Sequence, residues 1–275
     1  MPAEGDEGDE TSRRPEREGA AGHASAPGTA SQRSSERLAW VLAAKAGFVD
    51  AVGYIALYHL FTAHQSGNSD ALGVALGGGT WHAAWPRATS LVAFVVGIAV
   101  GTLLVEQCRR HRPRWAGGSL AVAELLVLGG TLAIGMIAGS AGHLAQADVP
   151  AYEGAAATLA GAMGIQTVTL RQVGRLRVRT TFVTGLLTNM SESFVVALHH
   201  PRGSQRQQFL RYSGFTASVW LLYVLGAIAG AGAERAWSFE ALGVPLAIVV
   251  LVGTWEFRHG FVPTLPTRGL PKPAE

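Results

Sequence analysis

Six long apolar stretches leave this chain few ways to fold. They run roughly over residues 38–61, 88–108, 119–140, 152–171, 211–232 and 240–257. A helix needs about 20 apolar residues to cross a hydrocarbon core of about 30 Å, so each stretch is long enough to span a bilayer. Only 15% of the residues are charged, well below the share in an average soluble domain. The sequence therefore predicts an all-α integral membrane protein with six transmembrane helices.

Polar tails flank this predicted membrane domain. Residues 1–36 lack hydrophobic periodicity and are rich in charged and small residues, which predicts a disordered cytoplasmic tail. Residues 37–258 form the predicted six-span domain. Residues 259–275 contain four prolines and are expected to form a second, proline-rich cytoplasmic tail.

The distribution of Lys and Arg predicts the orientation. Five precede the first stretch, four lie in the loop after the second, seven lie from residue 171 to residue 211, and three follow the last stretch. The loops on the other side have almost none. Because basic residues concentrate on the cytoplasmic side of membrane proteins, both termini are expected in the cytoplasm.

The two halves of the chain carry corresponding interruptions. A short apolar piece follows the first stretch at residues 67–79, and another follows the fourth at residues 182–199. Ser66 and Gly67 open the first piece, and Thr184 and Gly185 lie near the start of the second. With three spans per half, the second half must enter the membrane upside down. We therefore expect two inverted repeats, about 38–140 and 152–257, each with a short broken or re-entrant helix, as in many transporters.

Glycines at matching places are expected to serve helix packing. Gly47 and Gly164 lie in the first span of each half. Pairs spaced four apart lie in the second span of each half, where small residues let membrane helices approach closely: Gly97 with Gly101, and Gly226 with Gly230.

Asp50 is the main candidate for a functional side chain. It lies about twelve residues into the first span, close to the bilayer midplane, where an ionised carboxylate is costly unless it is paired or hydrated. It could bind a coupling proton or cation. Alternatively, it is a structural carboxylate held by Lys45, Gln166 or a backbone donor. Lys45 itself is expected to extend toward the cytoplasmic surface.

Other polar residues near the interruptions could line a path for an ion or solute. These candidates are Ser66, Gly67, Asn68, Asp70, Gln166, Thr184, Gly185 and Asn189. The structural alternatives are that Ser66 and Thr184 cap the short helices and that Gln166 bonds between helices. Glu124 and Glu256 are predicted to be interfacial. No cofactor is expected, and His, Cys and acidic residues show no metal-site spacing.

The motifs AGFVDA, SGN, AMGIQ and RTTFVTGLLTN together resemble the bacterial YoaK family of six-span inner-membrane proteins of unknown function. The resemblance covers residues 38–257 and implies a multi-pass protein of the bacterial cytoplasmic membrane. The chain departs from the family pattern at Ser66, where threonine is expected, and at Thr167, where asparagine is expected.

These patterns favour a small-solute transporter or channel-like carrier with a polar path at the repeat interface. A non-transporting scaffold or assembly protein is the alternative. A membrane-embedded enzyme is less favoured, because no catalytic motif is present. The expected partners are the lipid bilayer, an unknown small solute or ion and a second copy of the chain. Nucleic acid is not expected, because the arginines lie between apolar spans without a nucleic-acid motif.

Overall fold

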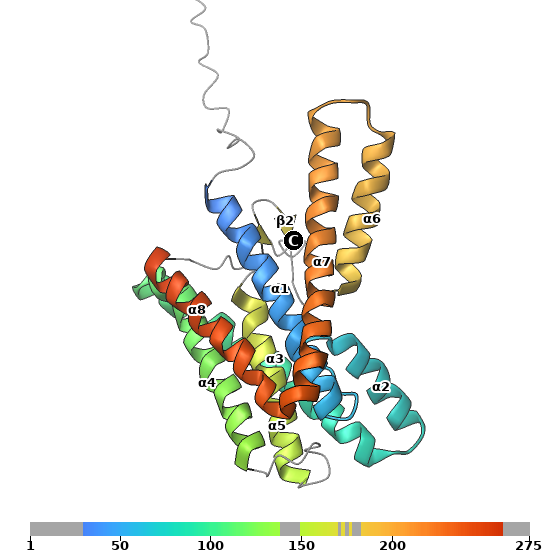
Figure 1. Cartoon of the computed structure of the whole chain (residues 1–275), viewed down its shortest axis with the longest axis vertical. Coiled ribbons are helices and arrows are strands. Elements are labelled where there is room, and N and C mark those ends of the chain that lie inside the picture. Colours follow the sequence, from blue (N-terminus) through green and yellow to red (C-terminus); the bar gives the residue numbers. More distant parts are fainter. Residues whose placement is uncertain (1–29, 138–148, 170–171, 174–175, 178–182, 261–275) are drawn as a thin grey trace, which may run out of the picture.

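The computed structural model describes residues 30–137, 149–169, 172–173, 176–177 and 183–260 (Figure 1). These residues form eight α-helices, two short 3-10 helices and one hairpin of two-residue strands. The helices are α1 (Ala30–Ala56), α2 (Gln65–Gly77), α3 (Trp81–His111), α4 (Ala116–Ile137), α5 (Val149–Thr169), α6 (Val183–His199), α7 (Ser204–Trp237) and α8 (Gly243–His259). Strands β1 (Gln172–Val173) and β2 (Leu176–Arg177) pair antiparallel. The 3-10 helices are η1 (Pro113–Trp115) and η3 (Ser238–Leu242).

Each of the predicted apolar stretches is helical over most of its described residues, and so are both short pieces. The largest difference between the predicted and the observed bounds is at the first span. There α1 begins at Ala30, inside the predicted tail, and ends at Ala56, before the predicted end at residue 61. Residues 1–29 and 261–275, which make up most of the two predicted tails, lie outside the described residues.

Four described segments are long and apolar enough to cross a membrane. They are Gln32–Ala56, Trp81–His111, Pro113–Ile137 and Ser204–His259, and the last of these covers α7, η3 and α8. The helix α5 is not among them, because much of its length consists of alanine, glycine and polar residues. Small side chains suit its position, since α5 is enclosed by protein: Leu159 is fully buried and Met163 is 1% exposed. A helix that meets other helices needs close packing more than lipid-facing bulk.

Two crossings of long helices form the centre of the molecule. The helix α1 packs most extensively on α7, and α3 packs most extensively on α5. In each crossing, small residues allow the backbones to meet. A Cβ added at Gly226 would collide with the carbonyl of Ala44, and one added at Gly97 would collide with the carbonyl of Gly161. At both crossings a glycine of a predicted pair therefore lies where two helix backbones approach closely.

The remaining predicted packing glycines behave in the same way. A Cβ at Gly47 would collide with the carbonyl of Tyr223 on α7, and one at Gly164 with the carbonyl of Phe94 on α3. A Cβ at Gly230 would collide with the backbone of Phe48, while one at Gly101 would lie 3.0 Å from the side chain of Val168. A larger residue therefore requires a backbone shift at Gly47, Gly164 and Gly230, and a side-chain shift at Gly101.

Replacing Gly226 by alanine is expected to separate α1 from α7 and to lower the melting temperature of the purified protein by several degrees. The added methyl group would overlap backbone atoms, and overpacking of this kind costs about 1–3 kcal/mol. Gly232→Ala is the matched control, because Gly232 lies on the same helix and a Cβ there meets nothing within 4 Å. A thermal unfolding series in detergent compares the two. Equal melting temperatures would show that the crossing tolerates separation.

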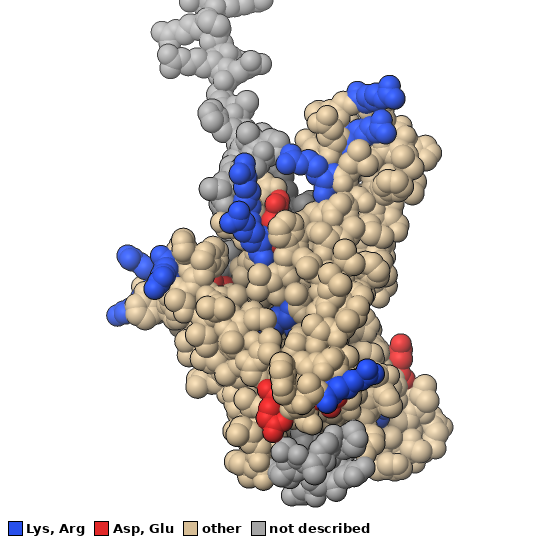
Figure 2. Space-filling model, in the orientation of Figure 1, with Lys and Arg blue, Asp and Glu red and all other residues tan. Residues whose placement is uncertain are grey.

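Two hairpins extend from this centre at opposite ends of the molecule (Figure 1). One is formed by α2 against α3, and the other by α6 against α7. Figure 2 shows most of the visible Lys and Arg side chains over the half that holds the start of α1, the end of α8 and the α6–α7 turn. The charge asymmetry that the sequence indicated therefore corresponds to one end of the fold.

Candidate functional site

The connector between α1 and α2, residues 57–64, folds back against α1. Its reversal uses Tyr58 and His59, which adopt positive φ values of 48° and 61°. Residues other than glycine rarely adopt this left-handed backbone conformation, so surrounding contacts must hold it. The reversal returns Thr62 and Ala63 to the level of Asp50, well inside α1.

Asp50 binds this connector with its carboxylate. Its Oδ1 accepts hydrogen bonds from the backbone N–H of Thr62 at 2.7 Å, the Thr62 hydroxyl at 3.1 Å and the backbone N–H of Ala63 at 2.6 Å. Its Oδ2 accepts a bond from the hydroxyl of Tyr223, on α7, at 2.5 Å. The residue is 3% exposed. Four donors compensate for the lost hydration of a buried carboxylate. This arrangement corresponds to the structural alternative for Asp50, in which backbone donors hold its carboxylate.

Asn68 fixes the same connector from the α2 side. Its Oδ1 accepts a bond from the backbone N–H of Phe61 at 3.1 Å, and its Nδ2 donates to the Phe61 carbonyl at 2.6 Å. The Nδ2 also donates to the side chain of Gln65 at 2.9 Å and reaches the hydroxyl of Ser90, on α3, at 3.3 Å. The first interruption of the apolar pattern is thus closed by Asp50 on one side and Asn68 on the other.

The neighbours of Asn68 on α2 are placed differently. Ser66 and Asp70 are exposed, and the Ser66 hydroxyl lies 3.1 Å from Nε2 of His64. Gly67 packs against the ring of Phe61, where an added Cβ would lie at 3.0 Å. The capping hypothesis for Ser66 is wrong, because α2 begins at Gln65 and His64 occupies the N-cap without a side-chain bond. Ser66 is inside the first turn instead.

The candidates from the second interruption do not join Asp50. Thr184, Gly185 and Asn189 lie on α6, which packs mainly on α7. Thr184 is exposed and is the second residue of α6, so it is not the N-cap residue that the alternative required. Among the described residues, no hydrogen bond or ion pair connects these three residues to Asp50 or Asn68.

Gln166 bonds between helices, as the structural alternative proposed. It is 1% exposed, and its Nε2 donates to the backbone carbonyl of Leu42, on α1, at 2.9 Å. Its Oε1 is buried without a hydrogen-bond partner among the described residues. Gln166 therefore ties α5 to α1 and leaves one acceptor available inside the bundle.

A buried charged cluster lies between α1, α4 and α8. The ammonium of Lys45 pairs with the carboxylate of Glu124, and the two residues are 1% and 3% exposed. Glu256 is fully buried, and within the described part of the chain neither of its carboxylate oxygens has a hydrogen-bond partner. It interacts electrostatically with both Glu124 and Lys45. We refer to Lys45, Glu124 and Glu256 as the charged cluster.

The charged cluster corrects one sequence prediction. Lys45 does not extend toward the surface, because it turns inward to an acid on another helix. Glu124 and Glu256, predicted near span ends, are both buried inside the protein. Intramembrane charges usually pair with one another, so a lysine well inside the first span was itself a signal that an acid on another span would face it. Tyr223 had no comparable signal, since a tyrosine in an apolar span is unremarkable by itself.

Comparison with known proteins agrees with this membrane architecture. Residues 38–255 match the profile of a family described as a protein of unknown function, DUF1275. The chain belongs to the DUF1275 family. It is also similar to the UPF0700 transmembrane protein YoaK of Bacillus subtilis (strain 168), with 29% identity over 209 residues, which is 76% of this chain and 88% of that protein. No solved structure matches.

Membership of the DUF1275 family confirms the resemblance inferred from AGFVDA, SGN, AMGIQ and RTTFVTGLLTN. The matched region includes Asp50, Asn68, Gln166, Lys45 and Glu124, and it ends one residue before Glu256. Together, the transmembrane relative and the long apolar helices identify a helical membrane protein.

Proposed function

We propose that this chain is a small-solute carrier of the bacterial cytoplasmic membrane, coupled to a proton or another monovalent cation. The observation that carries the proposal is Glu256, a fully buried carboxylate without a hydrogen-bond partner among the described residues. Buried ionisable groups in membrane helices are costly and mark ion or substrate pathways by default. The proposal contains no chemical step on a substrate, so the chain is not proposed to be an enzyme.

The charged cluster has one acid more than it has bases. Lys45 neutralises Glu124 through their ion pair, which leaves Glu256 without a compensating charge. A buried carboxylate in this position is stable only when it carries a proton or when a cation lies beside it. The cluster is therefore suited to take up one positive charge and release it when the helices separate.

We propose that six spans form two inverted repeats around this cluster: α1, α3 and α4, then α5, α7 and α8. The crossings support this pairing. In the first repeat, Ala44 and Gly47 of α1 meet α7; in the second, Gly161 and Gly164 of α5 meet α3 with the same three-residue spacing. The hairpins α2–α3 and α6–α7 also correspond. Lys45 and Glu124 then come from one repeat and Glu256 from the other, so the cluster lies at the repeat interface.

The orientation that we propose places both termini in the cytoplasm. The start of α1 and the end of α8 lie at the same end of the molecule, where most visible basic side chains are found (Figures 1 and 2). This arrangement agrees with the positive-inside rule. In this orientation the α2–α3 hairpin faces the opposite side of the membrane from the α6–α7 hairpin.

Glu256→Gln is expected to abolish charge movement that follows a step in pH. Full-length protein is reconstituted into liposomes adsorbed on a solid-supported electrode, and the transient current after the pH step is recorded. Glutamine has nearly the shape of glutamic acid but cannot bind a proton, so the variant should fold and give no current. Glu106→Gln is the control, because Glu106 is a partly exposed acid in surface ion pairs. An undiminished current in Glu256→Gln would remove Glu256 from the coupling site.

A scaffold without transport is the second candidate function. The observation that favours it is the closed connector, in which Asp50 and Asn68 use their polar atoms to hold residues 61–63. A scaffold would give no current after a pH step even in the unmodified protein. In that case the charged cluster would serve only to hold α1, α4 and α8 together.

A further inference from the structure

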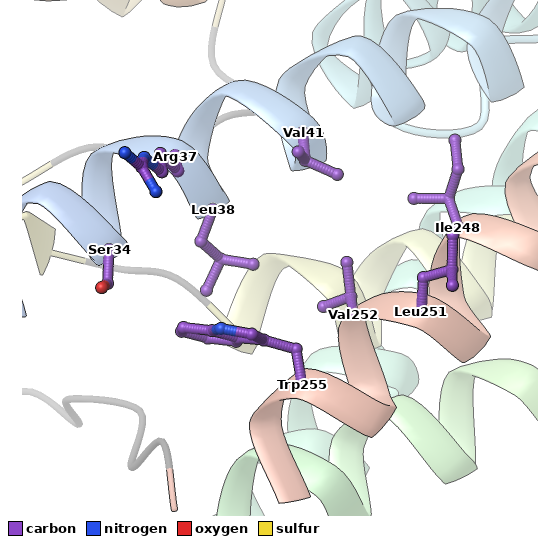
Figure 3. A pocket seen from close by; sticks show the side chains of 8 residues that line it. All are labelled: Ser34, Arg37, Leu38, Val41, Ile248, Leu251, Val252 and Trp255. Atoms are coloured by element: carbon purple, nitrogen blue, oxygen red, sulfur yellow. The ribbon is translucent and has the colours of Figure 1, made fainter. Parts of the chain in front are cut away.

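A groove lies on the outside of the bundle between α1 and α8 (Figure 3). It encloses about 350 Å³, which is within the range of small-molecule sites. The helix α1 contributes Ser34, Arg37, Leu38 and Val41, and α8 contributes Ile248, Leu251, Val252 and Trp255. On each helix these residues recur at three- and four-residue spacing over about two turns, so they form one face, roughly 10 Å long.

The groove exists because α1 and α8 pack loosely. The helices α4 and α5 pack along each other extensively, with Thr131 donating to Thr158 at 2.8 Å, whereas α1 and α8 share few contacts. Part of the groove faces outward. Val41 is 40% exposed and Leu251 is 71% exposed, whereas Leu38 lies at its base and is 5% exposed. Exposed apolar residues on a membrane helix face lipid.

Polar and apolar groups are separated along the groove. Arg37 and Ser34 lie at one end, close to Trp255, while Val41 and Ile248 lie at the other (Figure 3). Arg37 is exposed and has no ion-pair partner among the residues that the structure describes. Tryptophan favours the level of lipid headgroups. The groove thus offers an unpaired cation at headgroup level and an apolar channel that extends toward the bilayer centre.

We propose that an anionic phospholipid of the cytoplasmic leaflet occupies this groove. Its phosphate contacts the guanidinium of Arg37, and one acyl chain lies along Leu38, Val41 and Leu251. Arginine forms strong charge-assisted hydrogen bonds with phosphate, and anionic lipids are the ligands that basic pockets between membrane helices select. The bound lipid fills the space that direct helix contact fills between α4 and α5.

Thermal stabilisation by added lipid tests the proposal. Full-length protein in detergent is titrated with phosphatidylglycerol or phosphatidylcholine, and the melting temperature is measured at each concentration. A ligand that binds the folded state raises the melting temperature with concentration, so phosphatidylglycerol is expected to stabilise the protein more than phosphatidylcholine. Arg37→Gln should weaken the apparent affinity for phosphatidylglycerol by about tenfold, as the loss of one charged contact predicts. Val41→Trp should abolish the stabilisation by filling the groove.

Arg258→Gln is the matched control, since Arg258 is an exposed arginine at the same end of α8 and does not line the groove. An equal loss in Arg37→Gln and Arg258→Gln would show diffuse attraction to the basic end and would overturn the proposal. So would an equal response of the unmodified protein to the two lipids, or full stabilisation of Val41→Trp.

Fluorescence quenching locates the lipid directly. Phosphatidylglycerol brominated on its acyl chains is expected to quench the fluorescence of Trp255. The contribution of Trp255 is the part of the emission that the Trp255→Phe variant lacks. If Trp255 is not quenched and the Leu251→Cys variant crosslinks two copies of the chain, the groove is an interface between copies and the lipid assignment is wrong.

Discussion

Replacing Asp50 by alanine is expected to prevent the protein from accumulating in folded form. The substitution would leave four buried donors without an acceptor, from Thr62, Ala63 and Tyr223. Each unsatisfied donor costs about 1–3 kcal/mol, so the sum approaches the entire stability of a typical protein, about 5–15 kcal/mol. The measurement is the yield of monodisperse protein after extraction from membranes. Asp70→Ala is the control, because Asp70 is an exposed acid on α2 and should change stability little.

Asp50→Asn separates the structural role from a role in ion coupling. Asparagine keeps an acceptor for Thr62 and Ala63, but it loses the charge and places an NH2 group where Oδ2 accepts from the Tyr223 hydroxyl. We therefore expect a folded protein that is about 1–2 kcal/mol less stable. In the double variant Asp50→Asn with Tyr223→Phe, the loss of stability should be smaller than the sum of the losses in the two single variants, because both changes weaken the same hydrogen bond. If Asp50→Asn keeps full stability but loses the current after a pH step, Asp50 and not Glu256 would be the coupling residue.

The helices were the most predictable part of this fold. Lipid forces backbone polar groups to bond internally, so long apolar runs can only be helices. Their boundaries were less predictable, because the residues after Ala56 remain apolar while the chain turns. The turn depends on Asp50, which accepts bonds from residues twelve and thirteen positions later. Apolar content cannot reveal a helix end that is set by a distant side chain.

The candidate site was only partly predictable, since side-chain partners depend on how the helices cross. Asp50, Asn68 and Gln166 were singled out as polar candidates for a path or for structural hydrogen bonds. The particular residues to which they bond were not identified. Thr184 and Asn189 were grouped with them by analogy between the halves, although α6 packs mainly on α7. Residue correspondence between repeats predicts similar backbone positions. It does not predict shared surroundings when the neighbouring side chains differ.

Lys45→Met is expected to destabilise the protein by about 3–5 kcal/mol, because it leaves the carboxylate of Glu124 buried without its cation. The measurement is thermal unfolding in detergent. Arg109→Met is the control, since Arg109 forms a 3.7 Å ion pair with Glu106 at the surface and exposed pairs contribute about 0–1 kcal/mol.

The double variant Lys45→Met with Glu124→Leu identifies why the pair exists. Two apolar residues of similar volume often replace a buried ion pair at no cost in stability, so the double variant should regain most of what Lys45→Met loses. If the pair serves packing, the double variant should also keep its charge movement after a pH step. We expect the movement to change, because Glu256 would then face neither Lys45 nor Glu124, the two charges with which it interacts. A stable double variant with unchanged charge movement would mean that Glu256 acts without the other two residues, and that the Lys45–Glu124 pair only holds α1 to α4.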